Sequence, residues 1–219
     1  MLFQGEYYEP MEYLDARIPE LSYIRFFHAS PDAPAIDIYI NQRLVAKKLK
    51  YKSFTPYLGL ILGNYTVEIY AAGTYTNPVI KSNINIPPKS IFTAAAINEL
   101  ANIQLYVIPD PALPPLSNMA RLRFIHLSPN APSVDFTLPN GMDVFPDVSY
   151  KEITSYKSFV NGRYTFQLRL AGTDTIVLHV PNILLRPARN LTAYAVGLTS
   201  SHPPLQMLIV MDGSTYLHT

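Results

Sequence analysis

The chain has 219 residues, of which 48% are hydrophobic and 15% are charged, and this composition supplies a core and excludes disorder over the whole length. The net charge is +1 with no long basic run, which excludes the electrostatic footprint of a nucleic-acid-binding protein. Cysteine is absent, so disulfides, thiolate catalysis and zinc–cysteine sites are excluded as well.

Residues 1–20 are predicted to form an N-terminal arm rich in tyrosine and acidic groups, without a sustained hydrophobic period. One interpretation is an irregular tail. The other is an assembly arm that docks on a neighbouring subunit through Tyr7, Tyr8 and Tyr13. No apolar run is long enough for a secretory segment or for the ~18 residues of a membrane span, so neither is expected.

After the arm, the sequence contains two copies of one module. The segment Arg25–Asp37 reads RFFHASPDAPAID, and Arg123–Asp135 reads RFIHLSPNAPSVD, an offset of 98 residues. Further echoes follow at an offset of 99, among them Gly73 and Gly172. Because about a hundred residues can bury a core of their own, the duplication predicts two domains, residues 21–109 and 119–219.

Each copy has the pattern of short β-strands. Apolar residues alternate with polar ones at Ile36, Ile38 and Ile40, which indicates one buried face. Similar alternation marks three other stretches: Tyr65, Val67 and Ile69; Val134, Phe136 and Leu138; and Tyr164, Phe166 and Leu168. Glycine-containing and proline-containing turns separate the strands. The prediction is an all-β protein of two tandem antiparallel β-sandwich domains, immunoglobulin-like or transthyretin-like, each with about seven strands.

Two further segments have a structural interpretation. Residues 110–118 are dense in proline, which favours a short semi-rigid linker that restricts the orientation of the two domains. Leu113 and Leu116 of this segment are candidates for pinning it against a domain. Four lysines between residues 47 and 52 are expected on a solvated or edge-strand face that resists unwanted pairing.

The repeated motif is predicted to shape a stiff loop between strands. Two prolines three residues apart fix φ twice, and neighbouring polar side chains can then satisfy loop amides. The motif residues are His28, Ser30, Pro31, Asp32, Pro34 and Asp37 in the first copy, and His126, Ser128, Pro129, Pro132 and Asp135 in the second. We expect His28 on the core side of its strand, hydrogen bonded to Asp37, and His126 likewise bonded to Asp135.

A chemical role is the alternative interpretation of the motif. Ser, His and Asp close together in sequence do not define a nucleophilic triad, and no Gly-x-Ser-x-Gly elbow is present. His28, Asp32 and Asp37 are the residue types of a divalent-metal site. Both copies of a domain need their loops to be held in place, but both copies rarely need a catalytic site. The duplication of the motif therefore favours a structural role, and we predict a non-enzymatic protein with no cofactor and no metal.

On the residues of this motif, the chain resembles the bacterial family known as domain of unknown function 4397. The resemblance covers both copies and implies tandem β-sandwich modules in exported or envelope-associated proteins. The second copy departs from the pattern, since Asn130 stands where the first copy has Asp32. A tyrosine-rich version without an export signal resembles proteins placed on bacterial spore surfaces.

The predicted function is a structural or adhesive component of a bacterial cell or spore surface layer, with a cytoplasmic location as the alternative. It would self-assemble through the arm and the sheet edges or bind other surface proteins. The alternative function is binding of carbohydrate or another ligand, with Tyr39, Tyr57 and Tyr75 as stacking platforms. Neither nucleic acid nor a membrane is an expected partner.

Overall fold

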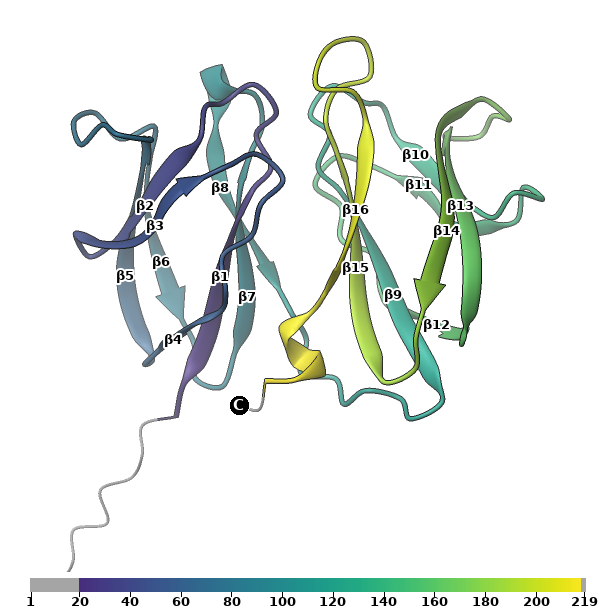
Figure 1. Cartoon of the computed structure of the whole chain (residues 1–219), viewed down its shortest axis with the longest axis horizontal. Helices are drawn as coiled ribbons and strands as arrows, with labels where there is room; N and C mark the ends of the chain where they lie inside the picture. Colours follow the sequence, from purple (N-terminus) through teal and green to yellow (C-terminus); the bar gives the residue numbers. More distant parts are fainter. Residues whose placement is uncertain (1–19, 218–219) are drawn as a thin grey trace, which may run out of the picture.

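The computed structural model describes residues 20–217 and is built almost wholly of strands (Figure 1). The assembly-arm tyrosines Tyr7, Tyr8 and Tyr13 lie outside the described residues. Sixteen strands and two short 3-10 turns make up the described part of the chain. They are β1 (Ser22–His28), β2 (Ile36–Ile40), β3 (Arg43–Leu49), β4 (Leu58–Leu60), β5 (Gly63–Ala71), β6 (Ile80–Ile86), β7 (Ile91–Ile97), η1 (Leu100–Asn102), β8 (Gln104–Pro109), β9 (Met119–His126), β10 (Val134–Thr137), β11 (Asp143–Val148), β12 (Lys157–Val160), β13 (Gly162–Leu170), β14 (Ile176–Leu185), β15 (Arg189–Val196), β16 (Gln206–Met211) and η2 (Gly213–Thr215).

The strands form two sandwiches of four-stranded sheets. The first pairs sheet β4-β1-β7-β8 with sheet β3-β2-β5-β6, and the second pairs β12-β9-β15-β16 with β11-β10-β13-β14. The predicted all-β fold of two sandwich units is confirmed, with eight strands in each unit rather than about seven. One pair in each unit is parallel, β1 with β7 and β9 with β15, and the other pairs within the sheets are antiparallel.

The predicted alternation places the cores inside each sandwich. Ile36, Ile38 and Ile40 of β2 are at most 5% exposed and pack in the first core. Val134 and Phe136 occupy the same place in the second core. Successive residues of a strand point to opposite faces of its sheet, so these isoleucines, two residues apart, share the face that meets the other sheet.

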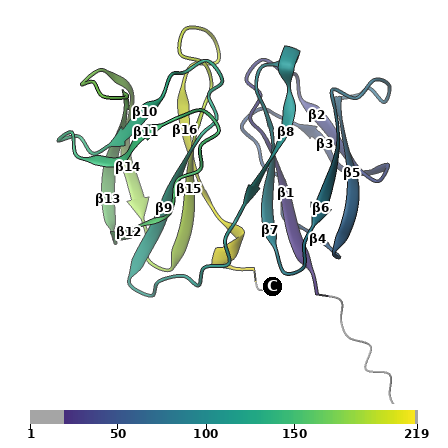
Figure 2. The same ribbon diagram turned by 180° about the vertical axis from the view of Figure 1, so that it is seen from behind.

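The inner strands bury both of their faces. In β1, Phe26 packs in the core of the first sandwich, whereas its neighbour Phe27 packs in a third apolar cluster that joins the two sandwiches. That cluster also holds Ile108 of β8, Ile125 of β9 and Tyr194 of β15. Figures 1 and 2 show two sheets side by side in the middle of the molecule, β4-β1-β7-β8 and β12-β9-β15-β16, which we call the inner sheets. The other two, β3-β2-β5-β6 and β11-β10-β13-β14, are the outer sheets. The two sandwiches are therefore packed directly against each other. The sequence predicts only the linker, residues 110–118, as a connection between them.

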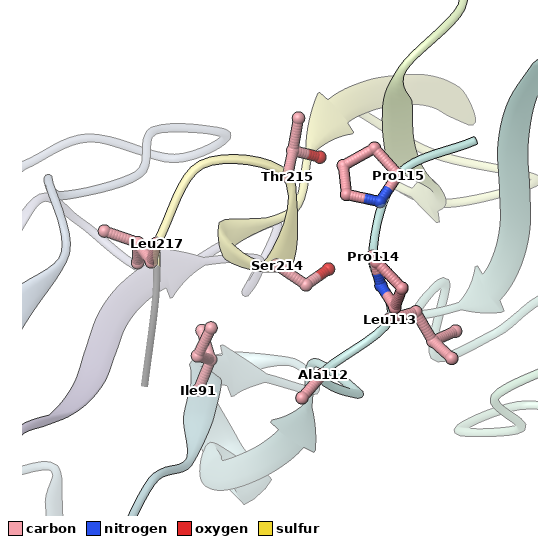
Figure 3. Close-up of a pocket in the computed structure, with 8 residues that line it drawn as sticks. All are labelled: Ile91, Ala112, Leu113, Pro114, Pro115, Ser214, Thr215 and Leu217. Atoms are coloured by element: carbon pink, nitrogen blue, oxygen red, sulfur yellow. The ribbon is translucent and has the colours of Figure 1, made fainter. Parts of the chain in front are cut away.

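The proline-rich linker is tied to the second sandwich. Asn190 Nδ2 donates to the Leu113 carbonyl at 2.7 Å, and the Ala188 amide donates to the Leu116 carbonyl at 2.9 Å. The linker and η2 enclose a small hollow, where Leu113 lies opposite Ser214 with Ile91 of the first sandwich below (Figure 3). The backbone of both linker leucines thus takes part in fixing the segment.

The lysine-rich segment lies where the sequence places it, at a sheet edge. β3 is an edge strand of the first sandwich, and Lys47 and Lys48 on it are exposed. Its pairing with β2 is interrupted by a bulge, where Lys48 has a φ of 54°. Both features oppose the addition of another strand at this edge.

Candidate functional site

The histidines of the repeated motif close their own loops. His28 is fully buried on the core side of β1, as predicted, and its Nε2 donates to the Pro34 carbonyl at 2.9 Å. His126 Nε2 donates to the Pro132 carbonyl at 3.1 Å in the second copy. Burial lowers the pKa of both histidines against the opposing effect of these carbonyls, so the rings are neutral. Each imidazole holds the loop six residues away.

The aspartates of the motif bind backbone amides, not the histidines. Asp37 Oδ1 accepts from the Lys48 amide at 2.6 Å and Oδ2 accepts from the Gly73 amide at 2.9 Å. The predicted His28–Asp37 hydrogen bond is wrong, because Asp37 points from β2 toward the bulge of β3 and the turn after β5. Burial opposes the charged carboxylate, but the amides of Gly73 and Lys48 outweigh it and lower the pKa of Asp37.

The second copy repeats this arrangement. Asp135 accepts from the Asp147 amide at 2.7 Å and from the Gly172 amide at 2.8 Å, so the predicted His126–Asp135 bond is wrong as well. Gly172 has a φ of 70°, a conformation that suits glycine. A carboxylate has two acceptor oxygens and no donor, and it therefore suits a place where two amides converge.

Asp32 and Asn130 accept equivalent backbone hydrogen bonds, although the first side chain is charged and the second is neutral. Asp32 Oδ1 accepts from the Leu100 amide at 2.7 Å, and Asn130 Oδ1 accepts from the Thr199 amide at 3.0 Å. The site needs one acceptor oxygen, and an amide supplies it as well as a carboxylate. Ser128 Oγ donates to the Gly197 carbonyl at 2.6 Å and ties the same loop to its neighbour.

The candidate metal ligands of the motif do not form a cluster. His28, Asp32 and Asp37 each bind a different piece of backbone, as described above. Within residues 20–217, no group of three or more His, Asp or Glu side chains could hold a metal ion.

A buried polar network joins the two sandwiches, and sequence reasoning did not find it. Arg123 of the second sandwich binds Asp110, which directly follows β8 of the first sandwich, at 2.7 Å, and its Nη1 donates to the Pro109 carbonyl. Arg25 of the first sandwich reaches Asp212 of the second at 3.5 Å, and its Nη1 donates to the Met211 carbonyl. We call this network the Arg–Asp clasp, defined by Arg25, Asp110, Arg123 and Asp212.

Four further side chains complete the clasp in matched pairs. Arg25 Nε donates to Thr93 and Arg123 Nε donates to Thr192, at 2.9 and 2.8 Å. Tyr57 and Tyr156 each donate a 2.5 Å hydrogen bond, to Asp110 and Asp212 respectively. Both hydroxyls are neutral, since burial raises their pKa values. The arginines begin the repeated motif, so the repeat itself was the signal that could have revealed the clasp.

The three predicted stacking tyrosines do not lie together. Tyr57 belongs to the clasp, where its ring lies under the Arg25 guanidinium at 4.8 Å, so its prediction as a platform for a ligand is wrong. Tyr39 and Tyr75 do meet, with ring centroids 5.1 Å apart on the outer sheet of the first sandwich. Tyr70, which sequence reasoning missed, packs against both.

The fold and the paired loops define an all-β protein of two sandwich units. The family model described as "Domain of unknown function (DUF4397)" matches residues 22–137, from the start of β1 to the end of β10. The chain belongs to this family, as the motif indicates. A comparison with curated proteins finds no match. Among residues 20–217, no helix is long and apolar enough to cross a membrane.

Solved structures give distant likenesses. The Bacillus anthracis TIE protein is 15% identical with a TM-score of 0.25, and the match covers 76% of this chain but 32% of that one. A streptococcal virulence factor described as binding alpha-glucan is 12% identical with a TM-score of 0.26, covering 90% and 100%. A candidate adhesin from Bacteroides ovatus is 10% identical with a TM-score of 0.25, covering 87% and 92%.

Proposed function

We propose that the protein is a non-enzymatic structural or adhesive component of a bacterial surface layer, on the cell or the spore. The observation that carries the proposal is the Arg–Asp clasp with the apolar cluster around it. Together they hold two sandwiches in one orientation, so that the outer sheets face away from each other at the two ends of the molecule (Figure 1). A unit of this kind displays two surfaces at a fixed spacing.

The non-enzymatic part of the proposal is supported by how the motif uses its polar groups. His28 and Asp37 have equivalents in the second copy that make the same backbone contacts. Asp32 is matched by an asparagine in the same role. Groups that are committed to loop backbone in both copies serve architecture.

Self-assembly through the N-terminal arm and the sheet edges belongs to the same proposal. The β3 and β11 edges are interrupted by bulges at Lys48 and Asp147, which have φ values of 54° and 47°. The β6 edge, by contrast, pairs with β5 in an unbroken register from Ile80 to Ile86. A regular edge strand is a template for another strand, so β6 is the edge that we assign to assembly.

Size-exclusion chromatography with light scattering tests the assembly directly. The full chain should be larger than a monomer, and a chain lacking residues 1–20 should be shifted toward the monomer. A monomer in both cases at high protein concentration would contradict assembly through the arm.

Carbohydrate binding is the second candidate function, and the tyrosine cluster on the outer sheet favours it. Tyr75 is 59% exposed although it packs against Tyr39 and Tyr70. Exposed aromatic rings in fixed positions suit the apolar faces of sugar rings. Glycan-array binding that is lost on substitution of Tyr75 by alanine would support this function.

A further inference from the structure

Three tyrosine rings pack on one another at the outer sheet of the first sandwich, from Tyr39 of β2, Tyr70 of β5 and Tyr75 of the turn between β5 and β6. Tyr70 and Tyr75 are stacked at 5.4 Å with an angle of 17° between their planes. Tyr39 meets both rings edge-on, at 5.5 and 5.1 Å. We call Tyr39, Tyr70 and Tyr75 the tyrosine cluster. None of the three belongs to the apolar core of the sandwich, so the core does not account for the cluster.

The cluster offers one ring to solvent in a fixed position. Tyr70 is 6% exposed, whereas Tyr75, which stacks on it, is 59% exposed. A ring that is already held by two neighbours loses little freedom when a ligand stacks on its open side. The surface is therefore preorganised for a flat apolar partner.

Polar side chains line a shallow hollow on the same sheet. The lining residues are Asn41, Gln42, Thr66, Glu68, Lys81 and Asn83. Tyr39 lies directly opposite Glu68 in the β2–β5 register, and Tyr70 is two residues beyond Glu68 on the same face of β5. From Thr66 to Tyr70 the strand rises roughly 13 Å, at about 3.3 Å per residue. Aromatic and polar surfaces thus form one continuous strip.

The strip contains one negative and one positive side chain, Glu68 and Lys81, which are paired with each other. Glu68 and Lys81 form an ion pair at 2.8 Å, which neutralises the two formal charges that line the hollow. Thr66 Oγ donates to Asn83 Oδ1 at 2.9 Å, and the remaining donors and acceptors are amides. This combination suits a neutral ligand with many hydroxyl groups better than a polyanion, which needs unpaired positive charge.

The second sandwich lacks the cluster at the equivalent positions. Thr137, Arg169 and Asp174 stand where the first sandwich has Tyr39, Tyr70 and Tyr75. Arg169 there forms an ion pair with Asp174 at 2.9 Å. The two units share a fold but differ at this face, so the tyrosines are not a requirement of the fold.

We propose that this strip binds a neutral oligosaccharide, with a pyranose ring stacked on Tyr75 and adjoining hydroxyls bonded in the polar hollow. The proposal rests on the carbohydrate-binding function proposed above and gives it a site and a ligand class. The ring contacts supply affinity, and the Glu68–Lys81 side of the hollow supplies hydrogen bonds that fix orientation.

The test uses the full chain and a panel of neutral hexasaccharides of glucose and of N-acetylglucosamine, with binding measured by calorimetry. Tyr75→Ala should weaken binding by at least about tenfold, because it removes the exposed ring. Tyr75→Phe keeps the ring and should retain most of the affinity. Asp174→Ala, at the matched position of the second sandwich, should leave binding unchanged, and circular dichroism should show all variants folded.

Each outcome bears on a different part of the proposal. If a hexasaccharide binds the wild-type chain and Tyr75→Ala retains full affinity, the site is wrong while carbohydrate binding stands. If no hexasaccharide binds, both the site and the carbohydrate-binding function are wrong. Binding of a dT oligonucleotide that is abolished by salt, in place of a saccharide, would overturn the neutral-ligand assignment.

Discussion

The inner and outer faces of the two sandwiches differ in how closely one copy follows the other. On the inner faces, Arg25 and Arg123 occupy equivalent positions and reach across to Asp212 and Asp110. On the outer faces, the tyrosine cluster of the first sandwich is replaced by the Arg169–Asp174 ion pair in the second. The comparison teaches that duplication kept the residues that join the modules and left the surfaces free to diverge.

The clasp has the properties expected of a joint rather than of a binding site. Its two carboxylates are fully buried, and each accepts a hydrogen bond from a tyrosine of its own sandwich while facing an arginine of the other. Gly213, next to Asp212, packs so closely that an added Cβ would lie 2.9 Å from the Tyr57 ring. Charged groups buried in this way contribute to a defined geometry only while every partner is present.

Asp110→Ala should have the largest effect on stability. It leaves Arg123 buried without its nearer carboxylate, with only Asp212 at 3.9 Å, a loss of about 3–5 kcal/mol in the free energy of unfolding. The matched control is Asp174→Ala, which removes a fully exposed partner from the outer-face pair and should leave the free energy of unfolding nearly unchanged. Urea unfolding followed by circular dichroism measures both, and equal losses would contradict the distinction between the faces.

Asp37→Asn should have the next largest effect. An amide side chain has one acceptor oxygen, so it cannot serve both the Lys48 and the Gly73 amides that Asp37 now binds. One part-buried amide loses its acceptor, at a cost of roughly 1 kcal/mol. Thermal unfolding compares this variant with the wild-type chain, and an unchanged melting temperature would show that the second oxygen is dispensable.

The pH dependence of stability should reveal the buried carboxylate of Asp212. Burial, together with the charge of Asp110, raises the pKa of Asp212 to about 6, against roughly 3.9 in an unfolded chain. Between these values the folded protein holds a proton that the unfolded chain releases. The contribution of Asp212 to stability therefore falls as the pH rises from about 4 to 6, by at most ~1.4 kcal/mol per pH unit, and is constant above.

The matched comparison for this titration is Asp212→Asn, which removes it. The groups that face Asp212 are Arg25, Arg123, Asp110, Thr192, Tyr57, Tyr156, Tyr194 and Tyr216. Urea unfolding at a series of pH values should show the wild-type chain losing stability relative to Asp212→Asn across this window. A wild-type chain whose stability relative to Asp212→Asn stays flat or rises with pH would contradict the sign that we assign.

Asp32→Asn should have the smallest effect, because it gives the first copy the residue of the second. Asn130 already accepts the equivalent amide bond at 3.0 Å. The change in the free energy of unfolding should lie within about 0.5 kcal/mol. A loss of more than about 1 kcal/mol would show that the charge at Asp32 has a role that the second copy does without.

The sequence was sufficient to predict the fold class, since alternation at Ile36, Ile38 and Ile40 and the 98-residue repeat are local signals. It did not reveal the parallel pairing of β1 with β7, whose registers join residues about 68 positions apart. The sequence also predicted correctly that His28 lies on the core side of its strand, because residues two apart on a strand point to the same face.

The sites were harder to predict because their partners come from distant segments. Asp37 meets Gly73 across 36 residues, and Arg25 meets Asp212 across 187. Tyr57 illustrates the difficulty, since nothing in its local sequence separates a ring in the clasp from a ring available to a ligand. Nearness to His28 in sequence suggested the wrong partner for Asp37.

The central claim is that the clasp and its apolar surroundings hold the sandwiches in one orientation. The chain has no cysteine, so the double variant Lys47→Cys and Asp143→Cys takes spin labels at two exposed sites, on β3 and β11. Double electron–electron resonance should then give a single narrow distance distribution. A broad distribution, or several distances of comparable weight, would contradict a fixed pairing of the two sandwiches.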